Sequence, residues 1–239
     1  MSAWRPLLLR HRELMQLHVE ALFTHDAGGR LLRVNERAGG PAPRFFVGLT
    51  SDGCVVRFRS DVDEPLRNEL QTAASRLHPD GNTARQPIDP EPYRTLLARV
   101  APIEKTWAGP VFAFSNAMPI TPAIVRVTDQ NAECLRTFLD SWIGDVALCQ
   151  PMLALLIDGR AVSLCCSVRV TEAAHEAGVE TAASMRGRGY APMVVASWAR
   201  AVREDGAVPL YSTSWQNQAS RSVAGKLDLV LVGSDLHIT

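Results

Sequence analysis

The chain has 239 residues, of which 46% are hydrophobic, so it can bury a core as one large domain or two small ones. Its 25 lysines and arginines balance 25 aspartates and glutamates, and a net charge of zero gives no global field that would favour nucleic acid or an anionic membrane. The first residues form too short an apolar run for a signal peptide, and no run of about 18 apolar residues occurs, so we expect a cytoplasmic protein.

The five cysteines are an odd number and lack the Cys-x-x-Cys spacing of a zinc site or a redox centre. Adjacent Cys165 and Cys166 would point to opposite faces of a strand, so they are poorly placed to share a metal ion. We expect reduced, buried thiols and no metal.

The first 120 residues predict a small α+β domain. Apolar side chains at helical spacing predict helices over residues 10–24, 65–77 and 93–100. Apolar runs predict strands over residues 30–35, 44–49, 54–59 and 111–114. In the third of these runs, residues 54–59, the side chains alternate as in a strand that is buried on one face. His18 lies on the apolar face of the first helix, where we expect a core-edge imidazole rather than a ligand. A proline cluster precedes residue 124, and we place a domain boundary near residue 120.

The next elements begin with a strand over residues 124–127. A helix follows over residues 132–142, and its spacing directs four apolar side chains inward, namely Leu135, Phe138, Leu139 and Trp142.

Two strands over residues 152–157 and 160–170 are joined by Asp158-Gly159, a strong hairpin signal. One face of the second strand is apolar, so we expect this face to lie in the hydrophobic core. The other face carries small and partly polar residues, including Ser163 and Ser167, and would suit either a substrate or plain solvent.

The most informative stretch is a short apolar strand over residues 178–183, a basic glycine loop and an amphipathic helix. The loop reads Arg186-Gly187-Arg188-Gly189-Tyr190-Ala191. Its glycines let the backbone approach a ligand at positive φ, and the helix N-terminus offers free N–H groups and a dipole that favour an anion. Pro192 suits the first helical turn. We interpret the loop as a binding site for a diphosphate.

The loop lacks the glycine and lysine spacing of a nucleotide-triphosphate P-loop and the three spaced glycines of a Rossmann fingerprint. Arg186-x-x-Gly189-x-Ala191 instead resembles the acyl-CoA pyrophosphate loop of the GNAT superfamily of N-acyltransferases. Residues 209–217, followed by residues 218–227, resemble that family's fifth strand, its asparagine and the helix after it. Two motifs in the family's order and spacing make this resemblance fairly specific.

The resemblance covers residues 121–239 and implies an α+β fold, an α/β sandwich whose mixed, mostly antiparallel sheet is flanked by helices. Residues 1–120 would be a smaller α+β N-terminal domain of unknown role, and a degenerate GNAT-like unit is one reading of them.

The implied activity is that of an acyl-CoA-dependent N-acyltransferase. An acetyl group would pass from acetyl-CoA, or another acyl group from its acyl-CoA, to a primary amine of an unknown small molecule or peptide, by direct attack in a ternary complex. The residues expected to bind the cofactor are Val179, Glu180, Thr181, Arg186, Gly187, Arg188, Gly189, Tyr190, Ala191, Asn217 and Ser220.

In this family the fourth and fifth strands splay apart, and the pantetheine arm pairs with the fourth strand, which here is residues 178–183. A freed backbone N–H would then face the thioester oxygen. Asn217 has a second expected role, because its side chain would cap the following helix at an amide near Ser220.

Catalysis would need a base, since a primary amine with a pKa near 10 arrives protonated. Glu180 is the candidate general base because it lies within the fourth strand. His175 and Glu176, placed before that strand, are alternatives. A cysteine nucleophile, Cys165 or Cys166 with His175, has no support in the spacing.

The acid that would protonate the departing thiolate is harder to assign. The family often has a tyrosine seven residues after the asparagine, and here that position is Ala224, which cannot donate a proton. Either the thiolate leaves without enzymatic protonation, or Ser220, Ser222 or Tyr211 serves.

The missing tyrosine motivates an alternative function, a non-catalytic acyl-CoA-binding or regulatory protein. A nucleotide or nucleic-acid module is the least favoured reading because the net charge is zero. We expect no nucleic-acid or membrane partner, and a homodimer is compatible with the sequence.

Overall fold

The computed structural model describes residues 9–80, 82–115 and 123–239, which form two compact units. The α4 unit comprises the described part of Phe114–Tyr211 together with Ser222–Leu229. The α1 unit comprises the described part of Leu8–Ala113 together with Ser212–Arg221 and Val230–Thr239. The predicted boundary near residue 120 lies outside the described residues, and the chain re-enters the α1 unit near its C-terminus, so the division into residues 1–120 and 121–239 stays a prediction.

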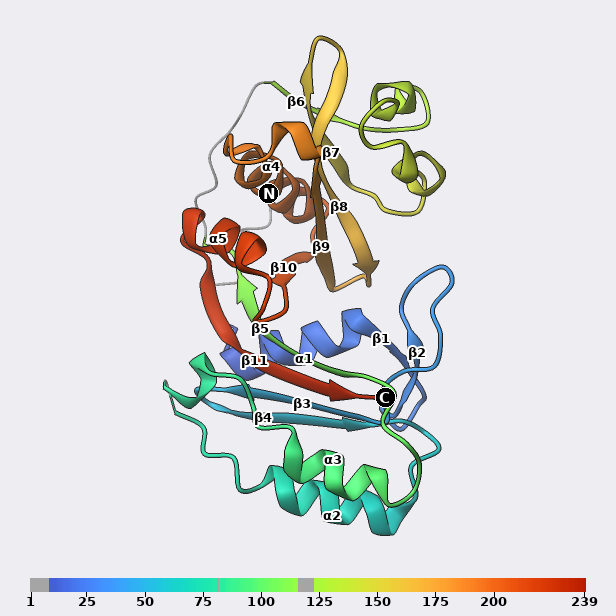
Figure 1. Ribbon diagram of the computed structural model, residues 1–239, viewed down its shortest axis with the longest axis vertical. Coiled ribbons are helices and arrows are strands. Elements are labelled where there is room, and N and C mark those ends of the chain that lie inside the picture. The colour runs from blue at the N-terminus through green and yellow to red at the C-terminus, as the bar shows by residue number, and fades with distance from the viewer. Residues whose placement is uncertain (1–8, 81, 116–122) are drawn as a thin grey trace. The chain divides into compact units, whose positions relative to one another are not determined.

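The α4 unit is built on five strands in the order β10-β9-β8-β7-β6 (Figure 1). They are β6 (Ile124–Arg126), β7 (Met152–Ile157), β8 (Arg160–Val170), β9 (Ala174–Thr181) and β10 (Val208–Ser212). All neighbouring pairs are antiparallel except β9 and β10, which are parallel. Asp158 and Gly159 both have positive φ, as the predicted two-residue hairpin requires. The prediction of a mixed, mostly antiparallel sheet flanked by helices is confirmed.

The helix α4 (Tyr190–Glu204) covers one face of this sheet. It buries the apolar stripe that its spacing predicts, including Val194, Val195, Trp198 and Val202. The short helix α5 (Gln218–Lys226) follows β10 in the chain. Because α4 lies over β8, the small and partly polar face of that strand is buried rather than open to substrate or solvent: Ser163 and Ser167 are both at most 1% exposed.

The opposite face is covered by two 3-10 segments, η3 (Ala132–Leu135) and η4 (Asp140–Asp145). The continuous helix predicted over residues 132–142 is therefore wrong. Thr137 lies between the two segments with φ of 94°, a conformation that no α-helix can contain. Leu135 and Leu139 are buried as predicted, whereas Phe138, expected to face inward, is exposed.

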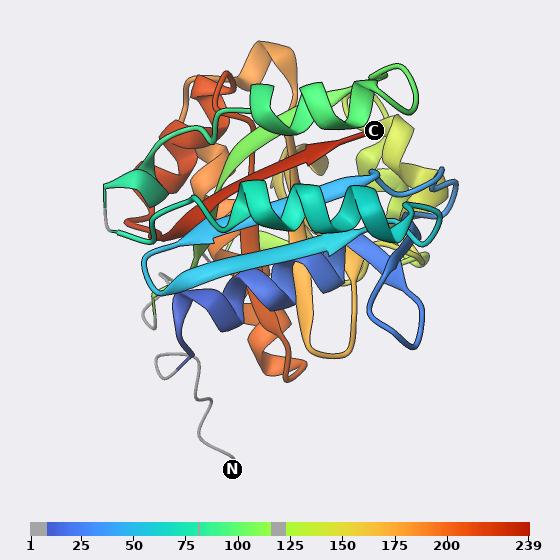
Figure 2. The same ribbon diagram turned by 90° about the horizontal axis from the view of Figure 1, so that it is seen from below.

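The α1 unit has a four-stranded antiparallel sheet in the order β4-β3-β11-β5. These strands are β3 (Phe45–Thr50), β4 (Gly53–Phe58), β5 (Thr106–Ala113) and β11 (Val230–Ile238). Two short strands, β1 (Phe23–His25) and β2 (Leu31–Val34), pair beside it. The helix α1 (His11–Leu22) lies on one face, and α2 (Glu64–Ala74) and α3 (Glu91–Ala98) lie on the other, as Figure 2 shows. One further 3-10 turn, η2 (Thr83–Arg85), precedes α3.

The predicted N-terminal helices and strands are all present, but β5 begins five residues before its predicted start, at Thr106. The sequence also gave no indication of β11, whose two neighbours, β3 and β5, lie more than 100 positions away in the chain.

Candidate active site

The basic glycine turn joins β9 to α4 within the α4 unit. Gly187 and Gly189 have φ of 78° and 81°, the left-handed region in which side chains are strained. No atom lies within 4 Å of where a Cβ would stand on either glycine, so backbone conformation rather than close packing requires glycine here. A 3-10 turn, η5 (Ala183–Met185), separates the strand from these residues.

Positive charge dominates the start of α4. Arg186 and Arg188 are both exposed, and Arg186 Nε donates to the backbone oxygen of Thr181 at 3.2 Å. Gly189 precedes the helix without a side-chain cap, and the first turn contains no acidic residue. Backbone N–H groups at a helix start, beside two guanidinium groups, form an arrangement that can bind an anion.

The strand β9 begins at Ala174, four residues earlier than predicted, so His175 and Glu176 belong to the strand rather than preceding it. Its register with β10 covers Ala174–Glu176, whereas its register with β8 continues to Thr181. Residues 177–181 therefore extend beyond the pairing with β10, and among the described residues no strand pairs with them on that side. After η5, the chain continues into the glycine turn. Among the predicted site residues, Val179, Glu180 and Thr181 belong to this extension.

The Glu180 side chain has a specific partner on the η4 segment. Trp142 Nε1 donates to Glu180 Oε2 at 2.6 Å, and both side chains are half-buried. On the other face of β9, Ser163 Oγ donates to the backbone oxygen of Glu180 at 3.2 Å and lies 2.8 Å from Thr181 Oγ1. These contacts fix both the carboxyl group and the backbone at this end of the strand.

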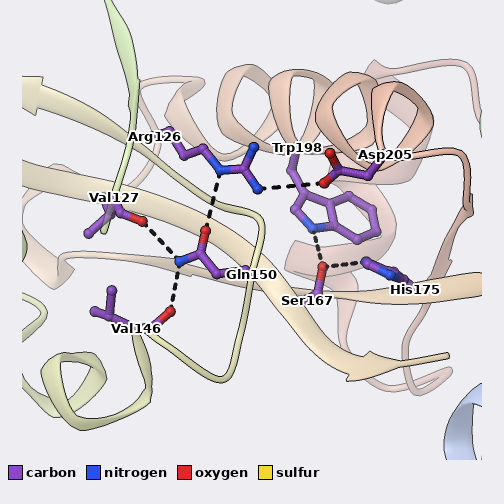
Figure 3. Close-up of polar contacts among 8 residues, drawn as sticks. All are labelled: Arg126, Val127, Val146, Gln150, Ser167, His175, Trp198 and Asp205. Carbon is purple, nitrogen blue, oxygen red and sulfur yellow. Dashed lines mark hydrogen bonds and ion pairs between the residues drawn. The ribbon is translucent and has the colours of Figure 1, made fainter. Parts of the chain in front are cut away.

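The two alternative bases are buried where β9 and β10 pair. His175 is 8% exposed and Glu176 2% exposed. Ser167 Oγ lies 2.9 Å from His175 Nδ1 and accepts from Trp198 Nε1 at 3.0 Å (Figure 3). Burial lowers the pKa of His175, although the nearby Asp205 carboxylate acts in the opposite direction. His175 therefore has a structural role in the packing of α4 on the sheet.

A second polar network in Figure 3 holds the end of the η4 region. Gln150 Nε2 donates to the backbone oxygens of Val127 and Val146, at 2.9 and 2.7 Å. Arg126 donates to Gln150 Oε1 and forms an ion pair with Asp205, at 3.3 and 3.5 Å. This network could not be predicted from the sequence, because its members are dispersed polar residues without a motif.

Asn217 and Ser220 belong to the α1 unit. Asn217 Oδ1 accepts from the Ser220 backbone N–H at 3.0 Å, so the expected helix cap is present. Their role toward a cofactor stays a prediction. Tyr211, one of the residues considered as the acid, is 1% exposed on β10. Ala224, at the position of the family's tyrosine, is buried on α5.

The five cysteines are free thiols, and burial raises the pKa of Cys165 well above its usual value. Within the described residues, no group of three or more His, Cys, Asp or Glu side chains is arranged to hold a metal ion. No helix in the described ranges is long and apolar enough to cross a membrane.

Residues 153–233, from β7 into β11, match a family model described as GNAT acetyltransferase. The resemblance predicted from the glycine loop is confirmed over this stretch. No curated protein matches the sequence.

Solved structures of GNAT proteins are similar to this chain. A GCN5-related N-acetyltransferase from Kribbella flavida is 14% identical, with a TM-score of 0.50, and the match covers 95% of this chain and 94% of that one. A GNAT acetyltransferase from Colwellia psychrerythraea is 13% identical, with a TM-score of 0.45, over 83% and 81%. A putative GNAT acetyltransferase from Novosphingobium aromaticivorans is 17% identical, with a TM-score of 0.48, over 57% of this chain and 65% of that one. At such identities the Kribbella match shows the fold alone.

Proposed function

We propose that this protein is an N-acetyltransferase that transfers the acetyl group of acetyl-CoA to a primary amine of a small molecule or peptide. The observation that carries the proposal is the end of β9, where pairing with β10 stops at Glu176 and the strand continues to Thr181. The free strand edge, the basic turn and the start of α4 follow one another in a short segment. This order suits an elongated ligand that has a flexible amide-containing arm and a diphosphate.

In this proposal, the pyrophosphate of acetyl-CoA binds the backbone N–H groups of residues 187–191, and Arg186 and Arg188 supply opposite charge. The pantetheine arm lies along residues 177–181 and pairs with β9 as an additional strand would. The positive φ of Gly187 and Gly189 supports this role, because the turn brings backbone rather than side chains toward the ligand.

Glu180 is the general base of the proposed reaction. It takes a proton from the acceptor ammonium, and the freed nitrogen lone pair attacks the thioester carbonyl. A carbon–nitrogen bond forms, the carbon–sulfur bond breaks, and the nitrogen loses its second proton to solvent. A thiol has a pKa of about 8.5, so CoA can leave as a thiolate near neutral pH without the tyrosine that Ala224 replaces.

The test is thiol release from acetyl-CoA with a panel of primary amines. Direct attack predicts no change in protein mass when acetyl-CoA is present without an amine. We expect Glu180→Gln to lower kcat by about 100-fold or more, the usual contribution of general base catalysis. The exposed Glu172, in the turn before β9, supplies the matched control Glu172→Gln, which should keep full activity.

The alternative is a non-catalytic acyl-CoA-binding or regulatory protein, which the alanine at position 224 favours. Such a protein would bind acetyl-CoA and release no thiol with any amine of the panel. Glu180→Gln would then leave its behaviour unchanged, and that result would replace the transferase proposal.

A further inference from the structure

The contact between Trp142 and Glu180 joins two segments that are 38 residues apart, η4 and β9, within the α4 unit. The helical spacing of residues 132–142 had predicted Trp142 as a core side chain only. Its ring does pack against an apolar cluster on this face of the sheet, but its N–H group points to the carboxylate.

Glu180 stands at the border of that cluster. It lies opposite Leu164 on β8, so the two side chains share a face, and Leu164 is fully buried in the cluster. Within the described residues, the Glu180 side chain forms no ion pair, and its hydrogen-bond donor is the indole N–H of Trp142. The oxygens of a half-buried carboxylate without a cation need a hydrogen-bond donor.

An indole N–H can donate but cannot accept. It therefore suits the ionised carboxylate, whose two oxygens only accept. The bond occupies Oε2 and fixes the plane of the carboxyl group, which leaves Oε1 for another donor.

We propose that Trp142 is the positioning residue of Glu180, holding Oε2 so that Oε1 receives the proton of the acceptor ammonium. This inference rests on the proposed function. In the step itself, one nitrogen–hydrogen bond breaks, one oxygen–hydrogen bond forms on Oε1, and the electron pair stays on the nitrogen. The η4 segment is itself held in place, since Gln150 binds the backbone of Val146 directly after it.

The kinetic test is Trp142→Phe, which removes the N–H group and keeps an aromatic ring. We expect kcat to fall roughly tenfold or more, because a misplaced catalytic group can cost up to about a hundredfold, while the KM for acetyl-CoA stays unchanged. Phe138→Leu, an exposed aromatic residue of the same region, is the matched control and should keep its kcat. An unchanged kcat in Trp142→Phe, in a protein whose activity depends on Glu180, would overturn the inference.

A second readout uses the full chain without any amine. The indole N–H resonance of Trp142, identified by its loss in Trp142→Phe, should move in Glu180→Gln, because the indole then loses its charged partner. Asp140 and Asp145 on η4 and Glu176 on the same face of β9 are the other nearby acids. Asp140→Asn, Asp145→Asn and Glu176→Gln should leave the resonance at its wild-type position, which assigns the movement to Glu180.

The two readouts separate the inference from the proposed function. An indole resonance that is unchanged in Glu180→Gln overturns the contact itself, whatever the activity. If the resonance follows Glu180 but no amine releases thiol from acetyl-CoA, the proposed function fails, and the positioning role fails with it.

Discussion

The Ser167 hydroxyl joins two buried side chains of the α4 unit, the indole of Trp198 and the imidazole of His175. The hydroxyl has one hydrogen and two lone pairs, so it can accept from the indole and donate its hydrogen to His175 Nδ1. That bond requires a neutral imidazole with its proton on Nε2, in agreement with the lowered pKa that burial causes. One hydroxyl thus connects β8, β9 and α4.

We expect Ser167→Ala to destabilise the protein by about 2–4 kcal/mol, because it leaves both the indole N–H and Nδ1 buried without this partner. The free energy of unfolding in urea measures the loss. Ser184→Ala, at an exposed site in η5, is the control and should change stability by no more than about 0.5 kcal/mol. Equal stabilities of the two variants would show that the buried bond contributes nothing.

The lowered pKa of His175 predicts a stability that falls on acidification. Below pH 6.5, the ordinary pKa of histidine, His175 binds a proton in the unfolded chain but not yet in the folded chain. Stability is therefore full above about pH 6.5 and decreases toward the folded pKa, by at most about 1.4 kcal/mol per pH unit. We expect wild type to lose more stability than His175→Asn when urea unfolding is compared at a pH about one unit above and one unit below the ordinary value. A larger loss in the variant would contradict this sign.

At the scale of single residues, the glycine turn could be predicted from the sequence, but the side-chain contacts near it could not. Gly189 and Arg186 belong to a short local pattern, whose backbone demands can be read from neighbouring residues. The partner of Glu180 could not be found in this way, since the helical spacing around Trp142 indicates core equally well and a contact across 38 residues leaves no local trace.

Among the elements, residues 132–142 show why periodicity can mislead. Leu135 and Leu139 are spaced as on a helix and are both buried, although the chain forms two separate 3-10 segments here rather than one helix. No glycine or proline in the sequence marks the break at Thr137. Where turn chemistry is explicit, as at Asp158-Gly159, the prediction is confirmed.

Thr137 is exposed and β-branched, and its φ of 94° is strained. We expect Thr137→Gly to stabilise the protein by about 0.5–1 kcal/mol, since relief of strain outweighs the greater freedom of glycine in the unfolded chain. Thermal unfolding measures the gain, and Thr137→Ala, which keeps a Cβ, should not share it. A glycine variant less stable than the alanine variant would show that the strain is absent in solution.

Across the whole molecule, the last strand departs most from what the sequence suggests. β11 lies between β3 and β5 in the α1 unit, so the N-terminal residues do not complete their own sheet. Strand pairing over so great a sequence separation cannot be inferred from propensity or pattern in one chain. The family resemblance helped only where motifs exist, at residues 186–191 and 209–227, and β11 contains none.

We therefore expect residues 9–113 expressed alone to lack a cooperative urea transition, because the central strand is missing. Ala113 lies opposite Val230 in antiparallel register, so an Asn-Gly turn could join them directly. A chain of residues 9–113, Asn-Gly and residues 230–239 should regain cooperative unfolding. If residues 9–113 alone unfold cooperatively, β11 is not needed for this unit.

The central claim is that the turn before α4 binds acetyl-CoA, and thermal unfolding with acetyl-CoA, CoA or ATP tests it most directly. Ligand at about 100 times its Kd should add about 2.7 kcal/mol of stability, roughly 5–10 °C for a chain of this size. Gly189→Glu adds a side chain and a negative charge at the turn. Gly206→Glu adds the same group after α4, at an exposed glycine that also has positive φ.

We predict that acetyl-CoA and CoA stabilise the protein and that ATP does not. The Gly206→Glu variant should keep this stabilisation, and a folded Gly189→Glu variant should lose it. Absence of any shift with saturating acetyl-CoA, or equal shifts in both glycine variants, would contradict the account.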